Sequence, residues 1–243
     1  ATPMVSGAAV LVSQKFPFLS GTQIANTLLT TANKDFQAPK LIVKYYTDSF
    51  NKTHYGLVYI DHQVPDKEQI KADLKIMNYT DEEIEKILSN LRDKDNSIIT
   101  LTKEEVFGQG ILDIQKALKG VAVLDANRLN IEDIAKFNDN NQNENQAFYT
   151  INTNGYNGEF SNDISQKLWE DKYHLDDAIN SPKEQMKNIK KIGLIKEGKG
   201  TLTLSGTNSY EGATRVQGGV LKLTGNLVKS NVYSKSGGNL LLN

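Results

Sequence analysis

The segments "GTLTLSG" (200–206), "GVLKLTG" (219–225) and "GNLLLN" (238–243) recur at a constant offset of 19 residues. Their leucines fall in register, in the sets Leu202, Leu221, Leu240 and Leu204, Leu223, Leu242. Leucines two residues apart in a strand point to the same side, so each segment offers one apolar face. Short strands at a fixed period of about 20 residues indicate stacked coils that bury a shared core. We therefore predict a parallel β-helix over residues 148–243, and the in-register leucines favour it over a β-sandwich.

A second, less regular repeat accompanies the first. The segments "GLIK" (193–196), "ATRV" (213–216) and "NVYS" (231–234) supply one more short strand for each coil. Glycines precede the leucine strands and are expected to form the corners between strands, because glycine adopts turn conformations without steric cost.

The chain begins with a helical, apolar region. The segment "ATPMVSGAAVLV" (1–12) has almost no polar face, which predicts a buried helix rather than an amphipathic one. Pro3 suits the first turn, where its missing N–H is not needed. Ser20 and Gln23 form a capping-box pattern that predicts the start of a second helix.

The middle of the chain mixes strands and helices. The alternation in "LIVKYY" (41–46) and "YGLVYIDH" (55–62) predicts two strands. A helical region over 66–92 contains a second capping box at Thr80 and Glu83. The turn in "FGQGILDIQKALKG" (107–120) leads into a short helix that Asp113 is expected to cap.

These patterns predict an α+β chain with three parts. Residues 1–137 form a first domain with an insert at about 38–105, residues 138–147 a polar linker, and residues 148–243 the β-helix. The linker assignment rests on "NDNNQNENQ" (138–146), which has nothing to bury.

The composition excludes several classes of function. The net charge of −1 and the pI near 6.4 give no reason to expect a nucleic acid or an anionic membrane as partner. The chain has no cysteine, which excludes disulfides, thiol catalysis and cysteine-ligated zinc. No apolar run reaches the roughly 18 residues that a membrane-spanning helix needs.

The histidines and acidic residues form only weak metal-binding motifs. His54, His62 and His174 are scattered, so no zinc site is expected. The remaining candidate is a calcium loop, in which positions 1, 3, 5 and 12 of an EF-hand-like segment are occupied by Asp93, Asp95, Ser97 and Glu104. Ile98 stands where that loop needs glycine, which favours a polar turn, a short strand and a helix cap at Thr102.

Tyrosines gather on the two strands of the insert. Tyr45, Tyr46, Tyr55 and Tyr59 are compatible with an exposed recognition surface, but aromatic alternation in a strand more often indicates core packing or cross-strand pairing. Ser6 is not interpreted as a nucleophile, although Asp and His occur elsewhere in the chain.

The opening segment resembles a known family. It is similar to the stretch that follows the nucleophile in subtilisin-like serine proteases (family S8), whose pattern is G-T-S-x-A-T-P-x-V-[SA]-G. The matching residues are Ala1, Thr2, Pro3, Val5, Ser6 and Gly7. The segment "FGQGILDIQKAL" (107–118) is similar to the glycine turn and final helix of that catalytic domain. Residues 193–225 resemble the autotransporter-associated β-strand repeat of secreted bacterial passengers, and "FSNDISQ" (160–166) resembles the segment that precedes it.

The resemblance implies a C-terminal fragment of a subtilisin-like autotransporter protease. The helical part would be the remnant of the α/β catalytic domain, followed by the first coils of a right-handed parallel β-helix. The family pattern places the nucleophilic serine two positions before Ala1, and the Asp, His and oxyanion-hole Asn further upstream. We therefore expect no catalytic residue, metal or cofactor in this polypeptide. Ala1, Thr2, Pro3 and Gly7 would flank the site, with Gly7 permitting close packing.

The resemblance also implies a location and partners. The intact protein would act on protein substrates at the cell surface of a Gram-negative bacterium, or after secretion, through an outer-membrane barrel downstream. An adhesin-like β-helical passenger without protease activity is the alternative. Exposure of Met4, Val5, Leu11 and Val12 would cost roughly 1.5–3 kcal/mol each. The opening helix is therefore expected to pack against another apolar surface, either within the chain or across a homodimer.

Overall fold

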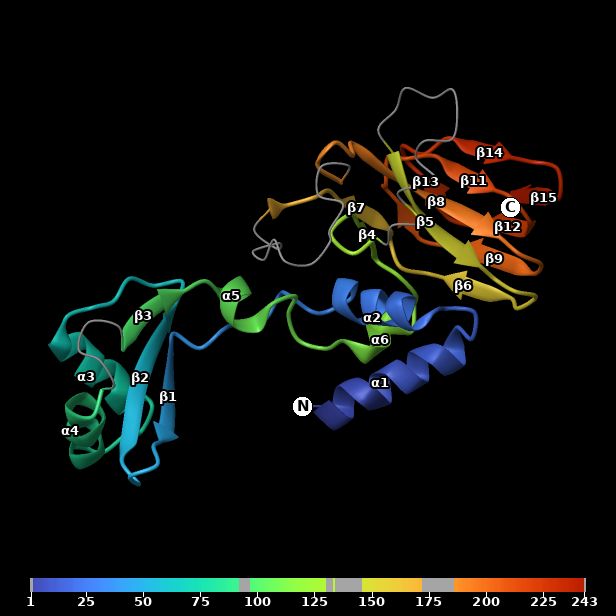
Figure 1. The fold of residues 1–243 in the computed structure, drawn as a ribbon. Helices are drawn as coiled ribbons and strands as arrows, with labels where there is room; N and C mark the ends of the chain where they lie inside the picture. Colours follow the sequence, from blue (N-terminus) through green and yellow to red (C-terminus); the bar gives the residue numbers. More distant parts are fainter. Residues whose placement is uncertain (1, 92–96, 130–132, 134–145, 172–185, 243) are drawn as a thin grey trace. The chain divides into compact units, whose positions relative to one another are not determined.

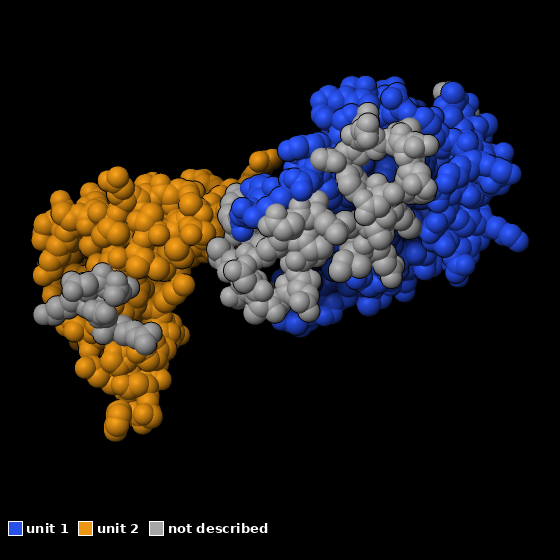
Figure 2. Space-filling model, turned by 45° about the horizontal axis from the view of Figure 1, so that its top comes forward, with its two compact units in different colours: residues 1–33, 112–243 blue, residues 34–111 orange. Residues whose placement is uncertain are grey.

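The computed structural model describes residues 2–91, 97–129, 133, 146–171 and 186–242. These residues form two compact units, shown in separate colours in Figure 2. Unit 1 contains residues 1–33 and 112–243, and unit 2 contains residues 34–111, which include the segment predicted as an insert. The opening helices thus share a unit with the repeats, although the sequence placed them in a separate domain. Most of the predicted linker lies outside the described residues, and its last two residues begin a strand.

The leucine repeats of unit 1 stack as one parallel sheet (Figure 1). Its strands, in the order of pairing, are β6 (Gly158–Phe160), β9 (Thr201–Leu204), β12 (Gly219–Leu223) and β15 (Gly238–Leu242). Leu221 pairs with both Leu202 and Leu240, so the 19-residue offset is the register of the sheet. The prediction of stacked, in-register leucine strands is confirmed.

The second repeat forms a second parallel sheet. Its strands, in the order of pairing, are β5 (Gln146–Asn152), β8 (Lys191–Glu197), β11 (Thr214–Val216) and β14 (Val232–Ser234). Two shorter parallel pairs complete the unit, namely β10 (Thr207–Asn208) with β13 (Asn226–Leu227), and β4 (Val123–Asp125) with β7 (Ser165–Lys167). Every strand pairing described in unit 1 is parallel, which fits a β-helix-like stack and not a sandwich of hairpins.

The core of the stack is built from the inward leucines. Leu202, Leu204 and Leu221 are fully buried. In the last described coil, Leu240 and Leu242 are 37% and 67% exposed. Each coil is therefore covered by its neighbour, as expected for a structure in which no single coil can bury its own apolar face.

One charged side chain lies inside the stack. Lys196 is fully buried, and its Nζ donates hydrogen bonds to the carbonyls of Glu197 (3.0 Å), Gly198 (2.8 Å) and Gly218 (2.9 Å). Burial lowers the pKa of Lys196 to about 8, while the charge of Glu197 acts in the opposite direction. Gly219 next to it has φ +62°, and a Cβ there would lie 2.9 Å from the Lys196 Nζ. The ammonium group thus joins the corners of two successive coils.

Among its described residues, unit 1 has the helices α1 (Thr2–Lys15), α2 (Gly21–Thr30) and α6 (Ile114–Ala117). The predicted capping box at the start of α2 is present, because the Ser20 side chain and the Gln23 backbone and side chain bond reciprocally. Asp113 caps α6 through the Lys116 N–H, as predicted.

Unit 2 contains a three-stranded sheet (Figure 1). Strand β1 (Leu41–Thr47) pairs antiparallel with β2 (Thr53–Ile60), which pairs parallel with β3 (Ile98–Leu101). The helices are α3 (Lys67–Ile76), α4 (Asp81–Ser89) and α5 (Lys103–Phe107). The apolar core between the sheet, α3 and α4 consists of Leu41, Leu57, Tyr59, Ile70, Leu74, Ile84 and Ile87. The predicted caps at Thr80 and Thr102 are both present.

A buried carboxylate ties this core together. Asp73 accepts hydrogen bonds from Lys40 Nζ (2.8 Å), Gln69 Nε2 (3.0 Å) and Tyr59 OH (3.1 Å). Burial raises the pKa of Asp73, but the bonds from Lys40, Gln69 and Tyr59 outweigh it and hold the pKa below its usual value. Desolvation and the Asp73 carboxylate raise the pKa of Tyr59. The cluster therefore links the residue before β1, the end of β2 and one face of α3.

Candidate functional site: the opening helix and its contact face

The predicted site-flanking residues lie in the first two turns of α1. Thr2 and Pro3 occupy its first turn, and Ala1 lies outside the described residues. Residues 2–7 are all exposed. The prediction of a helix is confirmed, but the prediction that it is buried is wrong for this half of the helix.

Burial of α1 is limited to one narrow face. Ala8 and Val12, four residues apart, are buried, and Phe16 continues the same row just after the helix. We call these three residues the α1 contact face. Met4 and Val10 remain 67% and 55% exposed. A uniformly apolar helix does not reveal which side will be buried, and unit 1 offers α1 an apolar surface on one side only.

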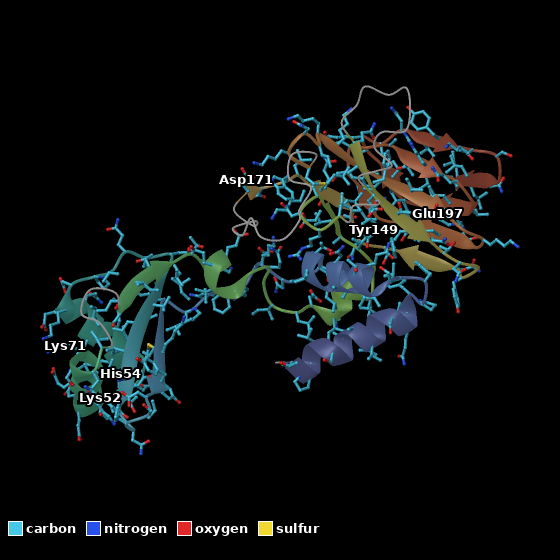
Figure 3. All side chains as sticks on the ribbon, viewed as in Figure 1. Lys52, His54, Lys71, Tyr149, Asp171 and Glu197 are labelled. Atoms are coloured by element: carbon cyan, nitrogen blue, oxygen red, sulfur yellow. The ribbon has the colours of Figure 1, made fainter. Side chains whose placement is uncertain are left out.

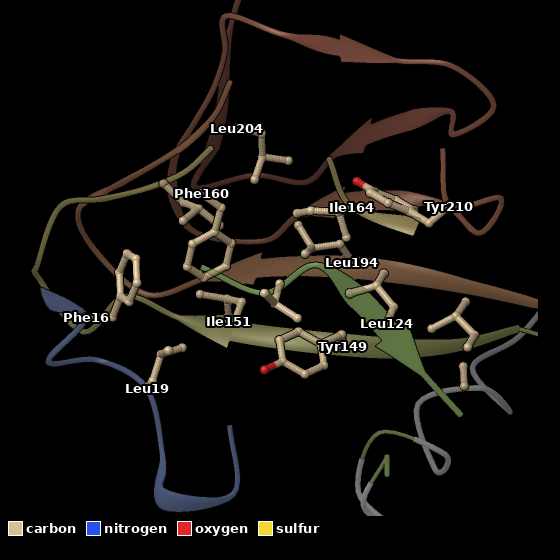
Figure 4. Packing of buried hydrophobic residues seen from close by; sticks show 14 of the residues in the cluster. Phe16, Leu19, Leu124, Tyr149, Ile151, Phe160, Ile164, Leu194, Leu204 and Tyr210 are labelled. Atoms are coloured by element: carbon tan, nitrogen blue, oxygen red, sulfur yellow. The ribbon is translucent and has the colours of Figure 1, made fainter. Parts of the chain in front are cut away.

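Aromatic rings join the α1 contact face to the first coil of the stack (Figure 4). The rings of Phe16 and Phe160 meet edge to face, with centroids 5.3 Å apart and planes at 82°. Phe18 lies 6.1 Å from Phe16 and packs so closely on Gly158 that a Cβ there would approach its ring to 2.6 Å. Phe160 is fully buried, so α1 and the β-stack share one core.

The side-chain amide of Gln23 connects α2 to the stack through a hydrogen bond. Its Oε1 accepts from the Ser20 N–H (3.0 Å) in the capping box, and its Nε2 donates to the Thr150 carbonyl of β5 (2.6 Å). Either Gln or Glu can complete a capping box, but only Gln23 keeps an N–H donor for a second partner. The sequence showed the first role of Gln23 and not the second, because the register of α2 against β5 is a tertiary feature.

Gly7 has open space beside it in this structure. A Cβ at Gly7 would meet nothing within 4 Å, so the residue permits no close approach here. Ser6 next to it is exposed on the same turn. The expectation that Gly7 permits close packing concerns the intact protease, and it stays a prediction.

Two of the three histidines lie within the described residues, and each has a hydrogen-bond partner in its own unit. His54 Nε2 lies 2.8 Å from Asp48 Oδ2, and His62 Nδ1 lies 2.5 Å from the Ile60 carbonyl oxygen. His174 falls outside the described residues. Over the described part of the chain, no group of three or more His, Asp or Glu side chains is arranged to hold a metal ion.

The possible calcium loop is only partly described. Asp93 and Asp95 lie outside the described residues. Ser97 is buried beside β2, where its carbonyl accepts from the Leu57 N–H, and Glu104 lies in the first turn of α5. The short strand and the Thr102 cap that the sequence favoured here are present.

The first turn of α1 offers an electrostatic environment suited to developing negative charge. The first N–H groups of a helix have no partner within the helix, and they form the positive end of its dipole. The first turn of α1 contains no acidic residue. Because Thr2 and Pro3 are exposed, this end of the helix is accessible to a reacting group supplied from elsewhere.

Comparison with known protein families identifies two segments of the chain. Residues 1–57 match the model of the subtilase family. Residues 194–223 match the passenger-associated-transport-repeat. The two matches, in this order, are those of a subtilisin-like autotransporter fragment. The subtilase match contains α1 and α2, and the repeat match runs from β8 through β12.

The search of the curated proteins and the search of the solved structures gave no match. Of the described helices, none combines the length and apolarity needed to cross a bilayer.

Proposed function

We propose that this chain is the part of a subtilisin-like autotransporter passenger that holds the active-site helix on a β-helical stalk. The supporting observation is that the α1 contact face, Ala8, Val12 and Phe16, lies in the same apolar core as the leucines of the repeats. A helix packed into the end of a rigid stack keeps a fixed position. The repeats then act as the support for α1 as well as a spacer.

The protein to which the chain belongs would be a serine endopeptidase. In a serine protease, a base activates the hydroxyl, and N–H donors stabilise the tetrahedral oxyanion. The family pattern puts the serine two positions before Ala1, at the free end of α1. The base, its orienting carboxylate and the oxyanion-hole amide would come from other parts of the protein. The chain's own contribution is to hold and orient the helix, and alone it would not hydrolyse peptide bonds.

The location and partners follow from the same proposal. A passenger of this type would be secreted or held at the surface of a Gram-negative bacterium, with a right-handed β-helix that continues toward an outer-membrane barrel. Its substrates would be proteins. Ala1, Thr2, Pro3 and Gly7 would flank the nucleophile without taking part in proton transfer.

The test begins with the encoded residues directly before Ala1. We expect Gly-Thr-Ser and one further residue there, with Asp and His segments further upstream. A protein that includes those segments should react with a fluorophosphonate probe, which labels activated serines. Replacement of that serine by alanine should abolish the labelling. The chain of residues 1–243 is the unlabelled control.

Two results would contradict the proposal. An unrelated sequence before Ala1 would leave the adhesin-like passenger as the better interpretation. A correct sequence whose product is folded but never labelled would exclude an activated serine.

A further inference from the structure

Strand β1 forms a free edge of the sheet in unit 2. The sheet order is β1-β2-β3, so β1 has one paired side and one open side. No described residue forms a backbone hydrogen bond to that open side. β1 is seven residues long and regular, whereas exposed edges in proteins are usually shortened, bulged or covered.

The hydrogen-bond pattern shows which groups point outward. The Ile60 N–H donates to the Lys40 carbonyl at one end of the ladder, and the Asp48 N–H donates to the Lys52 carbonyl at the other. In this register, the even-numbered residues of β1 direct their N–H and C=O groups toward β2. Narrow and wide pairs alternate in an antiparallel ladder. The N–H and C=O groups of Leu41, Val43, Tyr45 and Thr47 therefore face away from the sheet. This is a ready template for one more strand.

The face of the sheet opposite α3 and α4 is hollowed beside this edge. A depression of about 520 Å³ is lined by residues that include Lys44, Tyr46, His54, Gly56, Val58 and Ile99. Gly56 pairs with Lys44 across β1 and β2, and its missing side chain leaves the floor of the hollow open. The Tyr46 ring stacks on His54, with centroids 5.0 Å apart, and forms one wall.

Lys44 gives this face its charge. His54 is paired with Asp48 at 2.8 Å, and the pKa of Asp48 is lowered chiefly by its hydrogen bond with His54. Lys44 is exposed, and no carboxylate of the described chain forms an ion pair with it. An incoming strand would place one residue directly opposite Lys44, in the close, non-hydrogen-bonded type of pair. An acidic side chain at that position would complete a cross-strand ion pair.

We propose that β1 binds an extended peptide segment of a partner protein as a fourth strand, with an acidic residue opposite Lys44. The backbone groups of Val43 and Tyr45 would provide the pairing, and apolar residues at the alternate positions would cover the Tyr45 ring, which is 73% exposed. A second copy of this chain paired about Lys44 would bring two lysines face to face, which is unfavourable. The inference does not depend on the proposed protease function.

The experiment measures binding of a fluorescein-labelled, end-capped probe, Val-Thr-Val-Glu-Val-Thr-Val, to the full chain by fluorescence anisotropy. A second probe carries Lys in place of Glu, and a third carries N-methyl groups at the alternate residues that face β1. We expect saturable binding of the Glu probe, weaker binding of the Lys probe and no binding of the N-methylated probe.

Two variants assign the binding to β1. Lys44→Glu should weaken binding of the Glu probe about fivefold and strengthen binding of the Lys probe similarly, since it exchanges an attractive cross-strand pair for a repulsive one. Lys52→Glu, in the turn between β1 and β2, is the matched control and should change neither affinity (Figure 3). Tyr45→Pro removes an outward N–H at an edge, where proline is tolerated, and should abolish binding with an unchanged circular dichroism spectrum.

Three outcomes would overturn the proposal. One is the absence of binding in the millimolar range. Another is binding that Lys44→Glu and Tyr45→Pro both leave intact, which would place the peptide elsewhere. The third is a monomer–dimer equilibrium in sedimentation that Tyr45→Pro abolishes, without probe binding, which would assign the edge to self-association. If Tyr45→Pro does not fold, the affinities of Lys44→Glu for the Glu and Lys probes alone decide whether the peptide binds at β1.

Discussion

The Phe16 ring lies edge-on against the Phe160 ring, and this contact joins the opening helix to the first strand of the leucine sheet. Both side chains are fully buried. The pair lies 144 residues apart in the chain (160 − 16), so the contact couples the subtilase-like segment directly to the β-stack. It places the segment that matches the subtilase family in one apolar core with a β-stack whose later strands match the passenger-associated-transport-repeat.

Phe16→Ala should therefore destabilise unit 1 as a whole. We expect a loss of about 3–5 kcal/mol in the free energy of unfolding, the usual cost of truncating a buried phenylalanine. The fluorescence of Trp169, the only tryptophan, reports unfolding in urea because its ring packs partly buried against the same core. Phe50→Ala is the matched control, since Phe50 is 90% exposed, and it should change stability by less than about 0.5 kcal/mol. Equal effects of the two substitutions would refute the shared core.

Lys196→Met tests the ammonium group between the coils. The methionine keeps the apolar stem but leaves the carbonyls of Gly198 and Gly218 without this donor, whereas the Glu197 carbonyl still accepts from the Thr153 N–H (3.1 Å). We expect a loss of about 2 kcal/mol in the free energy of unfolding of unit 1, at roughly 1 kcal/mol for each of the two unmet acceptors. Lys199→Met, at an exposed position nearby, should be almost neutral. An unchanged urea midpoint for Lys196→Met would show that the three bonds contribute nothing net.

Asp73→Asn tests the buried carboxylate of unit 2 and its pH dependence. The folded pKa of Asp73 is depressed, so the carboxylate stabilises the fold above its unfolded pKa of about 4 and loses that effect as the pH falls through the folded value. The variant should be about 2 kcal/mol less stable near pH 7. The difference from wild type should shrink below about pH 4.

Hydrogen exchange of the β2 peptide at several pH values measures this difference. Glu82→Gln on the exposed side of α4 is the control and should follow the wild type throughout. A difference in stability between wild type and Asp73→Asn that stays constant down to pH 2 would contradict the depressed pKa of Asp73.

The exposed apolar residues of α1 predict self-association of the chain. Met4 and Leu11 are 67% and 44% exposed, and each would gain free energy on burial. We expect a concentration-dependent dimer in analytical ultracentrifugation, and the double substitution Met4→Ser with Leu11→Ser should shift it to monomer. Ile76→Ser removes an equally exposed apolar residue in unit 2 and should leave the dimer unchanged. A wild-type chain that is monomeric at every concentration would rule this out.

The local features of the fold were predictable where one residue type determines the geometry. The capping residues Ser20, Thr80, Thr102 and Asp113 all take the predicted positions, because a cap depends only on neighbours in the chain. The register of Leu202, Leu221 and Leu240 was equally readable, since a parallel stack repeats its inward positions at a constant offset.

The unpredicted features depend on which surfaces meet. Nothing in residues 1–12 indicated that Ala8 and Val12, rather than Met4 and Leu11, would be buried. The position of Lys196 in the sequence does indicate its burial. Lys196 lies two residues after Leu194 in β8, so both side chains point to the inward side of the strand. The tyrosines follow the interpretation of core packing or cross-strand pairing, since Tyr59 is in the core while Tyr45 and Tyr46 pair across the hairpin with Tyr55 and His54.

The chain leaves unit 1 after residue 33 and re-enters it at residue 112, and α2 contacts α6 on either side of that departure. The intervening 78 residues (34–111) carry their own apolar centre and caps. We therefore expect that this segment can be removed without unfolding unit 1. A short glycine-rich bridge from residue 33 to residue 112 should leave the remaining protein able to fold, and the excised piece able to be transplanted into another host.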